Sequence, residues 1–185
     1  MKLLPLTTFL SIIATVAAHV PAGGHAADVI LNLKNDPHGI KHVGADGIAR
    51  SYDVRGRVID SARLTRSQLL AVAKSASSED ERKHLQGLWA NVDPSKVDEA
   101  ELWEPPQHVL PTRFVNPEQH AKKMVDAGIV ASVAKAQYDA KKKLQTRFDW
   151  CEDVKCGDSW FCELFFLCGP CVELVEGVGH CMPLH

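Results

Sequence analysis

The sequence predicts an α+β fold: a mostly helical front section with a short β-hairpin, followed by a small disulfide-rich module at the C-terminus. Three observations support this prediction. Two β-prone runs flank a polar, glycine-containing connection before residue 62, apolar residues recur at helical spacing from residue 65 onward, and all six cysteines lie in the last 35 residues. A chain of 185 residues is long enough for one ordinary domain and such a module.

The N-terminus has the pattern of an export signal. Met1-Lys2 gives a short positive start, an apolar stretch follows from Leu3 to Val16, and Ala17-Ala18 supplies the small residues before a cleavage site. A membrane anchor needs about 20 apolar residues in a row, whereas this run ends at His19. We therefore expect residues 1–18 to be a signal peptide and the mature protein to be secreted.

Residues 19–62 have the composition of strands and turns. Val29-Ile30-Leu31 is a short apolar run within this section. Further on, Ile48–Tyr52 and Val58–Asp60 are β-prone, and the polar connection between them contains Gly56. A glycine in a short polar connection between two such runs predicts a hairpin with a loop or bulge.

The pattern becomes helical from Thr65. Thr65 with Gln68, and Ser78 with Glu81, have the spacing of capping boxes, in which each side chain satisfies a free backbone N–H at a helix start. Apolar residues then follow at helical spacing, which predicts core-facing stripes. These residues are Leu69, Val72, Ala73, Leu85, Leu88, Trp89 and Val92.

Two later helices are marked by proline. Asp93-Pro94 is an N-cap followed by proline in the first turn, and it predicts a short helix toward Leu102 and Trp103 that Glu104-Pro105-Pro106 ends. Asn116-Pro117 predicts a long helical segment to about Arg147, hinged at Gly128. We expect Trp103, like Trp89, to belong to the core.

A change in composition marks a boundary near Arg147. Residues 151–185 hold six acidic residues against one basic residue, Lys155, and they contain every cysteine. A tail this short cannot bury much apolar surface. Cross-links must therefore take the place of a hydrophobic core. We therefore expect a domain at residues 19–147 and a six-cysteine module at residues 148–185. A variant of this interpretation makes residues 19–147 a pro-region.

The cysteines are expected to form disulfides. An even number of cysteines packed closely in an exported chain indicates a disulfide framework, and secretion favours it over a zinc site. Six cysteines allow 15 pairings, and the residues alone do not choose among them. The cysteines are Cys151, Cys156, Cys162, Cys168, Cys171 and Cys181.

The spacing from Cys151 to Cys181 resembles that of the inhibitor-cystine-knot (knottin) family of secreted peptides. The resemblance implies three bridges, Cys151 to Cys168, Cys156 to Cys171 and Cys162 to Cys181. One departure is that the third and fourth cysteines, adjacent in many knottins, are separated here by residues 163–167.

Cys168-Gly169-Pro170-Cys171 has the letters of the thioredoxin-family redox motif. A reactive pair of this kind needs its first thiol at a helix N-terminus in a βαβ context. Only 14 residues follow Cys171, which is too few for the rest of such a fold. We expect Gly169 and Pro170 to form a tight turn between cysteines of different bridges.

Large apolar side chains gather in the module. We expect them to form a contact surface for a partner, because a small module cannot hide all of them. The alternative is that they dock onto the helical part of the same chain. The candidate binding residues are Trp160, Phe161, Leu164, Phe165 and Phe166.

The layout resembles small secreted cysteine-rich proteins of the effector, toxin or inhibitor type that are common in fungi. The resemblance implies action by contact with an unknown protein or surface target, with membrane contact left open, and we expect no enzyme activity, cofactor or metal. A formal net charge of -2 with no long basic block excludes an ordinary nucleic-acid binder. The alternatives are a secreted enzyme with an accessory cysteine-rich module, or a thiol–disulfide redox protein that uses Cys168 and Cys171.

Overall fold

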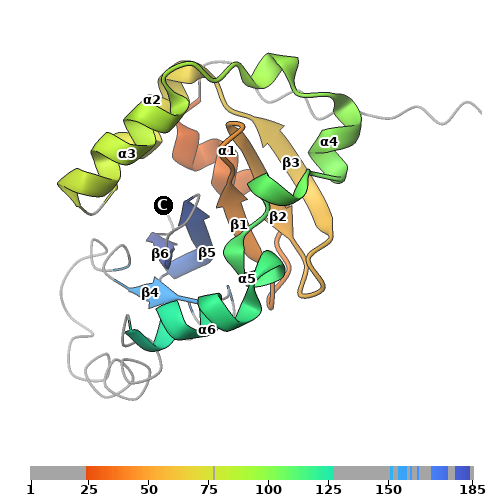
Figure 1. The fold of residues 1–185 in the computed structure, drawn as a ribbon, viewed down its shortest axis with the longest axis vertical. Coiled ribbons are helices and arrows are strands. Elements are labelled where there is room, and N and C mark those ends of the chain that lie inside the picture. The colour runs from red at the N-terminus through yellow and green to blue at the C-terminus, as the bar shows by residue number, and fades with distance from the viewer. Residues whose placement is uncertain are drawn as a thin grey trace, which may run out of the picture.

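Strands from both ends of the chain form one sheet, and helices cover it (Figure 1). The structure is a computed structural model, and it describes residues 24–76, 78–126, 151, 154–157, 159, 162, 168–174 and 178–183. The predicted α+β class is confirmed, with helices, a mixed sheet and three disulfides in the C-terminal region.

Within the described residues, the sheet has six strands in the order β3-β2-β1-β5-β6-β4. Neighbouring strands are antiparallel except β1 and β5, which are parallel. The strands are β1 (Ile40–Val43), β2 (Ile48–Tyr52), β3 (Val58–Arg63), β4 (Lys155–Cys156), β5 (Cys168–Leu174) and β6 (Gly179–Pro183).

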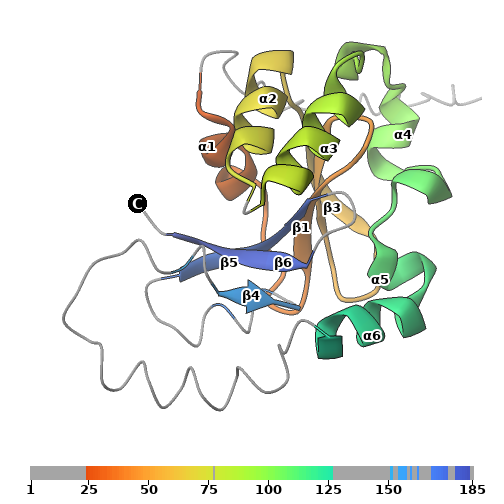
Figure 2. The same cartoon turned by 60° about the vertical axis from the view of Figure 1, so that its left-hand side comes forward.

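The helices in the described part of the chain are short and lie on both sides of the sheet. Figure 2 shows α1, α2 and α3 together on one side, with α5 and α6 on the other. The α-helices are α1 (Ala26–Asn32), α2 (Arg66–Lys74), α3 (Glu79–Trp89), α4 (Glu99–Trp103), α5 (Thr112–Val115) and α6 (Pro117–Asp126). Two 3-10 turns, η1 (Pro94–Lys96) and η2 (Gln107–Val109), lie between α3 and α5.

The parallel pairing of β1 with β5 crosses the boundary expected near residue 147. His42 of β1 lies opposite Glu173 of β5, with Lys41 opposite Val172 and Val43 opposite Leu174 in the same register. We call this junction the β1–β5 seam. The cysteine-rich tail therefore continues the sheet of the front section.

The core on the α1–α3 side is apolar and contains Trp89, whose side chain is fully buried. Its indole Nε1 donates to the Gly44 carbonyl at 3.1 Å, so the one polar atom of this large side chain is satisfied. The sheet supplies Val43, Ala49 and Val172 to this cluster. Strands from both parts of the chain thus share one apolar core.

The opposite side of the sheet has a different core. All six cysteines are buried there, in contact with Ile40 of β1 and Tyr52 of β2. Phe114 of α5 packs against this cluster, with its ring centroid 5.5 Å from that of Tyr52. Half-cystines make up most of the buried residues of this cluster, whereas the α1–α3 side is mainly aliphatic around Trp89.

The predicted hairpin is confirmed as β2 and β3. Its connection is closed by the Asp53 carboxylate, which accepts the N–H groups of Arg55 and Arg57, each at 2.9 Å. Gly56 takes a positive φ of 78°, and a Cβ there would lie 2.9 Å from the Phe114 ring. Glycine is required at this position both by the backbone angle and by the close packing of α5.

The helix caps predicted from the sequence are also confirmed. Thr65 accepts from the Gln68 N–H while the Gln68 side chain accepts from the Thr65 N–H at 2.8 Å, which completes the capping box of α2. Ser78 accepts from the Glu81 N–H at the start of α3. At the start of α6, the Asn116 side chain accepts from the Gln119 N–H.

The interpretation of residues 19–62 as strand and turn was wrong for Val29–Leu31, which lie in α1. Ala26, Val29, Ile30 and Leu33 are all buried. Their spacing of three, one and three residues is that of one helix face. The Asp28 carboxylate also accepts the His25 N–H, as an acidic residue does near a helix start.

The helix expected after Asp93-Pro94 is divided in two. Asp93 does cap the first turn, through the Ser95 N–H, but Val97 is extended and separates η1 from α4. Trp103 was wrongly expected in the core, since it is 47% exposed at the end of α4. The long helix expected after Asn116 is described as far as Asp126, and its remainder with the Gly128 hinge lies outside the described residues.

Candidate functional site

Three disulfides cross-link the C-terminal strands. Their pairs are Cys151–Cys168, Cys156–Cys171 and Cys162–Cys181, with Cα–Cα distances of 5.6, 5.9 and 5.5 Å. These are the pairs that the knottin spacing implies, and no cysteine is left free. The disulfide-stabilised, cysteine-rich character of the protein is thereby shown, while membership in the knottin family stays a prediction.

The Cys168–Cys171 segment is part of a strand, and the expectation of a tight turn was wrong. The pairing of β5 with β6 shifts register between Cys168 and Cys171, so that the strand is irregular there. Pro170 has no N–H to donate, and proline in a sheet is confined to edges and such irregular positions. The two sulfurs belong to different bridges, as expected, so they do not form the reversible dithiol pair that a redox motif uses.

Ser159 ties the cysteine-bearing strands to the front section. Its N–H donates to the Gly39 carbonyl at 3.1 Å, and its hydroxyl lies 3.3 Å from the side-chain oxygen of Asn35. The same hydroxyl accepts the Cys171 N–H at 3.3 Å. Arg113 of α5 adds a second tie by donating to the Gly157 carbonyl at 2.6 Å. No sequence pattern indicated either contact, because each joins residues far apart in the chain.

Three sulfurs, those of Cys156, Cys162 and Cys181, lie within 4.8 Å of one another. A metal site needs deprotonated thiols, whereas each of these sulfurs is bonded in a disulfide. The three sulfurs lie close together because the Cys156–Cys171 and Cys162–Cys181 bridges are neighbours.

The predicted contact residues Trp160, Phe161, Leu164, Phe165 and Phe166 lie outside the described residues. The ends of the segment 163–167 are described, however. Cys162 is bonded to Cys181 of β6, and Cys168 begins β5 with its own bridge to Cys151. Separate disulfides therefore fix the chain on both sides of this segment.

The sheet also carries a buried polar row that no sequence pattern indicated. Arg50 of β2, His42 of β1 and Glu173 of β5 lie side by side across three strands, because His42 pairs with both of the others. All three are almost fully buried. Polar groups buried in this way cost free energy unless they are paired or hydrogen-bonded.

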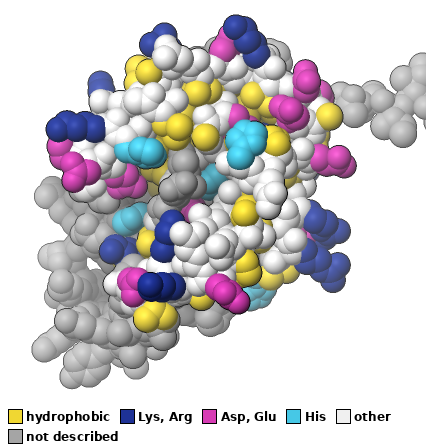
Figure 3. Space-filling view, viewed as in Figure 1, with side chains coloured by type: hydrophobic (Ala, Val, Ile, Leu, Met, Phe, Trp, Pro, Cys, Tyr) yellow, Lys and Arg dark blue, Asp and Glu magenta, His cyan; other side chains and the backbone are white. Residues whose placement is uncertain are grey.

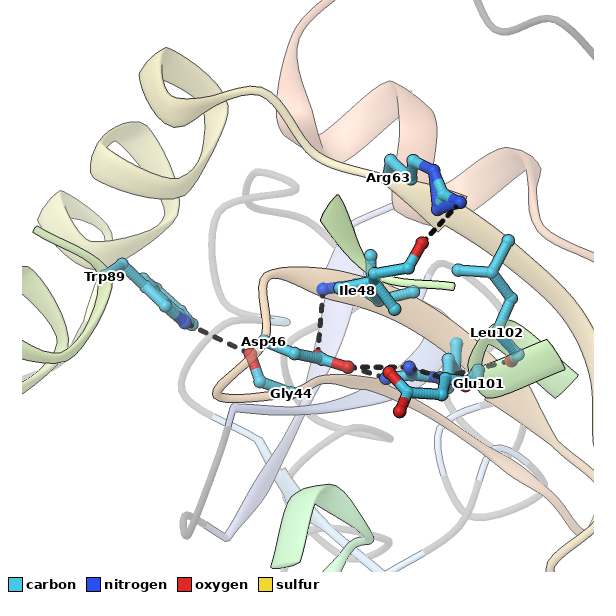
Figure 4. Close-up of polar contacts among 9 residues, drawn as sticks. Gly44, Asp46, Ile48, Arg63, Trp89, Glu101 and Leu102 are labelled. Carbon is cyan, nitrogen blue, oxygen red and sulfur yellow. Dashed lines mark hydrogen bonds and ion pairs between the residues drawn. The ribbon is translucent and has the colours of Figure 1, made fainter. Parts of the chain in front are cut away.

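Arg50 is well satisfied at its end of the row, by acceptors on Asp46, Glu101 and Leu102, which Figure 4 labels. Asp46, in the turn between β1 and β2, accepts two hydrogen bonds from the guanidinium, at 2.6 and 3.1 Å. The carbonyls of Glu101 and Leu102 in α4 accept two more, at 3.0 and 3.2 Å. Arg50 therefore holds α4 against the sheet, which is a structural role.

Glu173, at the other end of the row, is not satisfied in this way. Its side chain is 2% exposed, and its Oε1 has no hydrogen-bond partner among the described residues. Burial raises the pKa of this carboxyl to about 7, against the opposing attraction of Arg113 and Lys123. The nearby Tyr52 hydroxyl likewise lacks a partner in the described part of the chain, and burial raises its pKa further above the usual range.

A second polar row lies on the α1–α3 side of the same strands. Lys41, Ser51 and Asp60 are paired in register across β1, β2 and β3. The Lys41 ammonium donates to the Leu31 carbonyl at 2.8 Å, and burial lowers the pKa of this lysine to about 8, although Asp60 opposes the shift. The Ser51 hydroxyl has no partner among the described residues, so Lys41 does not activate it as a nucleophile through a hydrogen bond.

An open groove of about 510 Å³ runs along the start of α2, between residues 63–66 and 90–95. Arg63 lies at its edge but donates to the Val97 carbonyl at 2.8 Å, and Thr65 is engaged in the helix cap. Arg63 and Thr65 therefore already serve the fold.

Figure 3 shows one face of the surface, on which acidic, basic and apolar side chains are interspersed. Among the described residues, the large apolar side chains that are well exposed are Val54, Trp103, Val115 and Val125. No helix in the described part of the chain has the length and apolar character needed to cross a membrane.

Comparison with known proteins found a curated relative. The chain is 36% identical over 101 residues to the "Lactobacillus up-regulated protein" of Emericella nidulans, a match that covers 53% of this chain and 55% of that protein. The chain thus spans about half of the length of this relative. No family model and no solved structure matches the chain.

Proposed function

We propose that this chain is a secreted, disulfide-stabilised binding protein of the effector, toxin or inhibitor type, which acts by contact with a protein or a surface. The observation that carries the proposal is the anchoring of residues 163–167 between two bridges, Cys162–Cys181 and Cys151–Cys168. Binding residues are often carried by loops that a rigid scaffold positions. Leu164, Phe165 and Phe166 lie in this anchored segment.

The buried cystines support an extracellular role. All six cysteines are at most 3% exposed, so the bridges lie within the fold. Disulfides persist in oxidising compartments and are rare in the cytosol. The apolar N-terminal stretch, expected to be a signal peptide, is consistent with this localisation.

Export and bridging are tested by expressing the full chain with its own N-terminus and recovering it from the medium. Non-reducing intact-mass analysis should give a chain that begins after Ala18 and is lighter by two hydrogens for each bridge than its reduced form. Retention of the chain in the cells, or six free thiols in the recovered protein, would contradict the proposal.

Binding is tested by co-sedimentation. Because the relative from Emericella nidulans carries Lactobacillus in its name, washed Lactobacillus cells are the first surface to use, with phosphatidylcholine–phosphatidylglycerol vesicles as the second. The expected result is that the triple variant Leu164→Ser, Phe165→Ser, Phe166→Ser loses at least about tenfold in affinity, since hot spots are dominated by a few large side chains.

The matched control is Val125→Ser, which changes an exposed apolar residue on α6, outside the cysteine-rich tail. It should bind as the wild type does. Equal binding of the wild type and the triple variant would show that the 163–167 segment is not the contact surface.

A further inference from the structure

The junction between the front section and the cysteine-bearing strands is held without a covalent cross-link. Each bridge joins two residues within 151–181, so none of them crosses the β1–β5 seam. Among the described residues, the contacts that cross the seam are non-covalent. They are the parallel pairing of β1 with β5, the shared core around Val172, and the hydrogen bonds of Ser159 and Arg113. The stability of this junction therefore depends on the groups buried in it.

Glu173 is buried at the centre of the seam, opposite His42. On its side of the sheet, β2 contributes Arg50, whose guanidinium is paired with Asp46, and the hydroxyl of Tyr52. The helices α5 and α6 contribute Arg113 and Lys123, which attract the carboxylate, and burial together with these two cations lowers the pKa of His120 on α6.

None of these groups donates to Glu173 Oε1, which is buried without a partner among the described residues. A protonated carboxyl carries no charge and is tolerated in such a place. An ionised one needs donors or water that the closed seam does not supply.

We propose that the β1–β5 seam is a pH-sensitive junction: protonated Glu173 lets the cysteine-bearing strands sit closely on β1, and ionised Glu173 loosens them by drawing water into the seam. The loosening is local, because β5 stays paired with β6 and bridged to β4 by Cys156–Cys171, while β1 to β3 keep their own pairing. The proposal goes beyond the binding function above and does not depend on it.

The direction of the effect follows from linkage. Glu173 has the ordinary glutamate pKa of 4.5 when the seam is open, and burial raises that pKa to about 7 when the seam is closed. Between these two pKa values Glu173 is protonated in the closed form and ionised in the open form. The free energy that favours the closed seam therefore falls as the pH rises through this range, and it stays constant at higher pH.

The test is amide hydrogen exchange of the full chain, wild type against Glu173→Gln, at pH 5.5 and pH 8.5. Because the two proteins are compared at the same pH, the intrinsic pH dependence of exchange cancels. The ratio of wild-type to variant exchange rates at the amides of Lys41–Val43 and Val172–Leu174 should rise by roughly 30-fold between the two pH values. The β3 amides should exchange more slowly than the seam amides at both pH values, because opening of the seam leaves the β2–β3 pairing intact.

Glu104→Gln serves as the matched control, because it removes an exposed carboxylate at the end of α4. A constant ratio at the seam would overturn the proposal. Equal protection of the seam and β3 amides would also overturn it, since the opening would then be global. If Glu173→Gln does not fold, the wild type alone decides, because its seam protection, corrected for intrinsic rates, must fall between the two pH values and stay below that of β3.

Discussion

The two halves of the sheet are stabilised in different ways. Around β1, β2 and β3, the α1–α3 side buries a large apolar cluster centred on Trp89. Around β4, β5 and β6, the opposite side buries six half-cystines, which among the described residues share their cluster with Ile40 and Tyr52 of the front section. The contrast indicates that the tail joins the front section by strand pairing. The short strands of the tail bury little apolar surface, so they depend on disulfide cross-links for stability.

The largest effect should come from the apolar half. Trp89→Ala should lower the free energy of unfolding by about 3–5 kcal/mol, because it opens a cavity in the core and removes one of the two N–H donors to the Gly44 carbonyl, the other being that of Gly47. Urea unfolding at fixed pH measures this loss. Trp103→Ala is the control, and the half-exposed side chain should cost less than about 1 kcal/mol. Equal losses would mean that Trp89 is not the centre of the core.

The cross-linked half should depend on its bridges. The double substitution Cys162→Ser, Cys181→Ser opens a loop with a sequence separation of 19, and the chain-entropy model gives a loss of about 3 kcal/mol for such a loop. Hydrogen exchange should quicken at β6 and stay slow at β3. An equal change at both strands would show that the two halves do not differ as described.

The seam that joins the two halves should respond to pH. The stabilising contribution of protonated Glu173 is fully present below pH 4.5, is lost as the pH rises toward 7, and is absent above it. From pH 4.5 to above pH 7 the loss amounts to at most about 3 kcal/mol in the free energy of unfolding. Urea titrations over this range measure the loss, and Glu173→Gln should remove it. An unchanged pH dependence in the variant would assign the effect to other groups.

The smallest effect concerns a helix cap in the apolar half. Thr65→Ala should cost about 1 kcal/mol, because the Gln68 N–H at the start of α2 loses its acceptor. Thr65→Ser retains a hydroxyl and should restore most of this stability. If both substitutions cost the same, the cap hydrogen bond is not the cause.

Much of the fold was predictable where the signal is local. The α2 and α3 caps, the β2–β3 hairpin and the residues buried by α2 follow from spacing within about ten residues. The β1 strand was missed because Lys41 and His42 interrupt its apolar pattern, and α1 was misread because its run is short. The exposure of Trp103 was not predictable, since a short helix at the edge of β3 buries only part of its surface.

The candidate site was likewise predictable from the sequence only in part. The six cysteines and the apolar segment between the third and the fourth could be located from the sequence. The burial of Glu173, Arg50 and His42 had no sequence signal, because charged residues are ordinarily exposed. Only the pairing of β1 with both β2 and β5 brings these three side chains together.

Neighbouring residues alone were enough to specify the helix starts, the hairpin and the concentration of cysteines at one end. The placement of β5 beside β1, the choice of disulfides and the burial of particular charged side chains required the folded chain. Strand register between residues about 130 positions apart depends on the whole core that both strands share. The same long-range pairing buries Glu173 at the junction between the two halves of the sheet, with its Oε1 lacking a hydrogen-bond partner among the residues described.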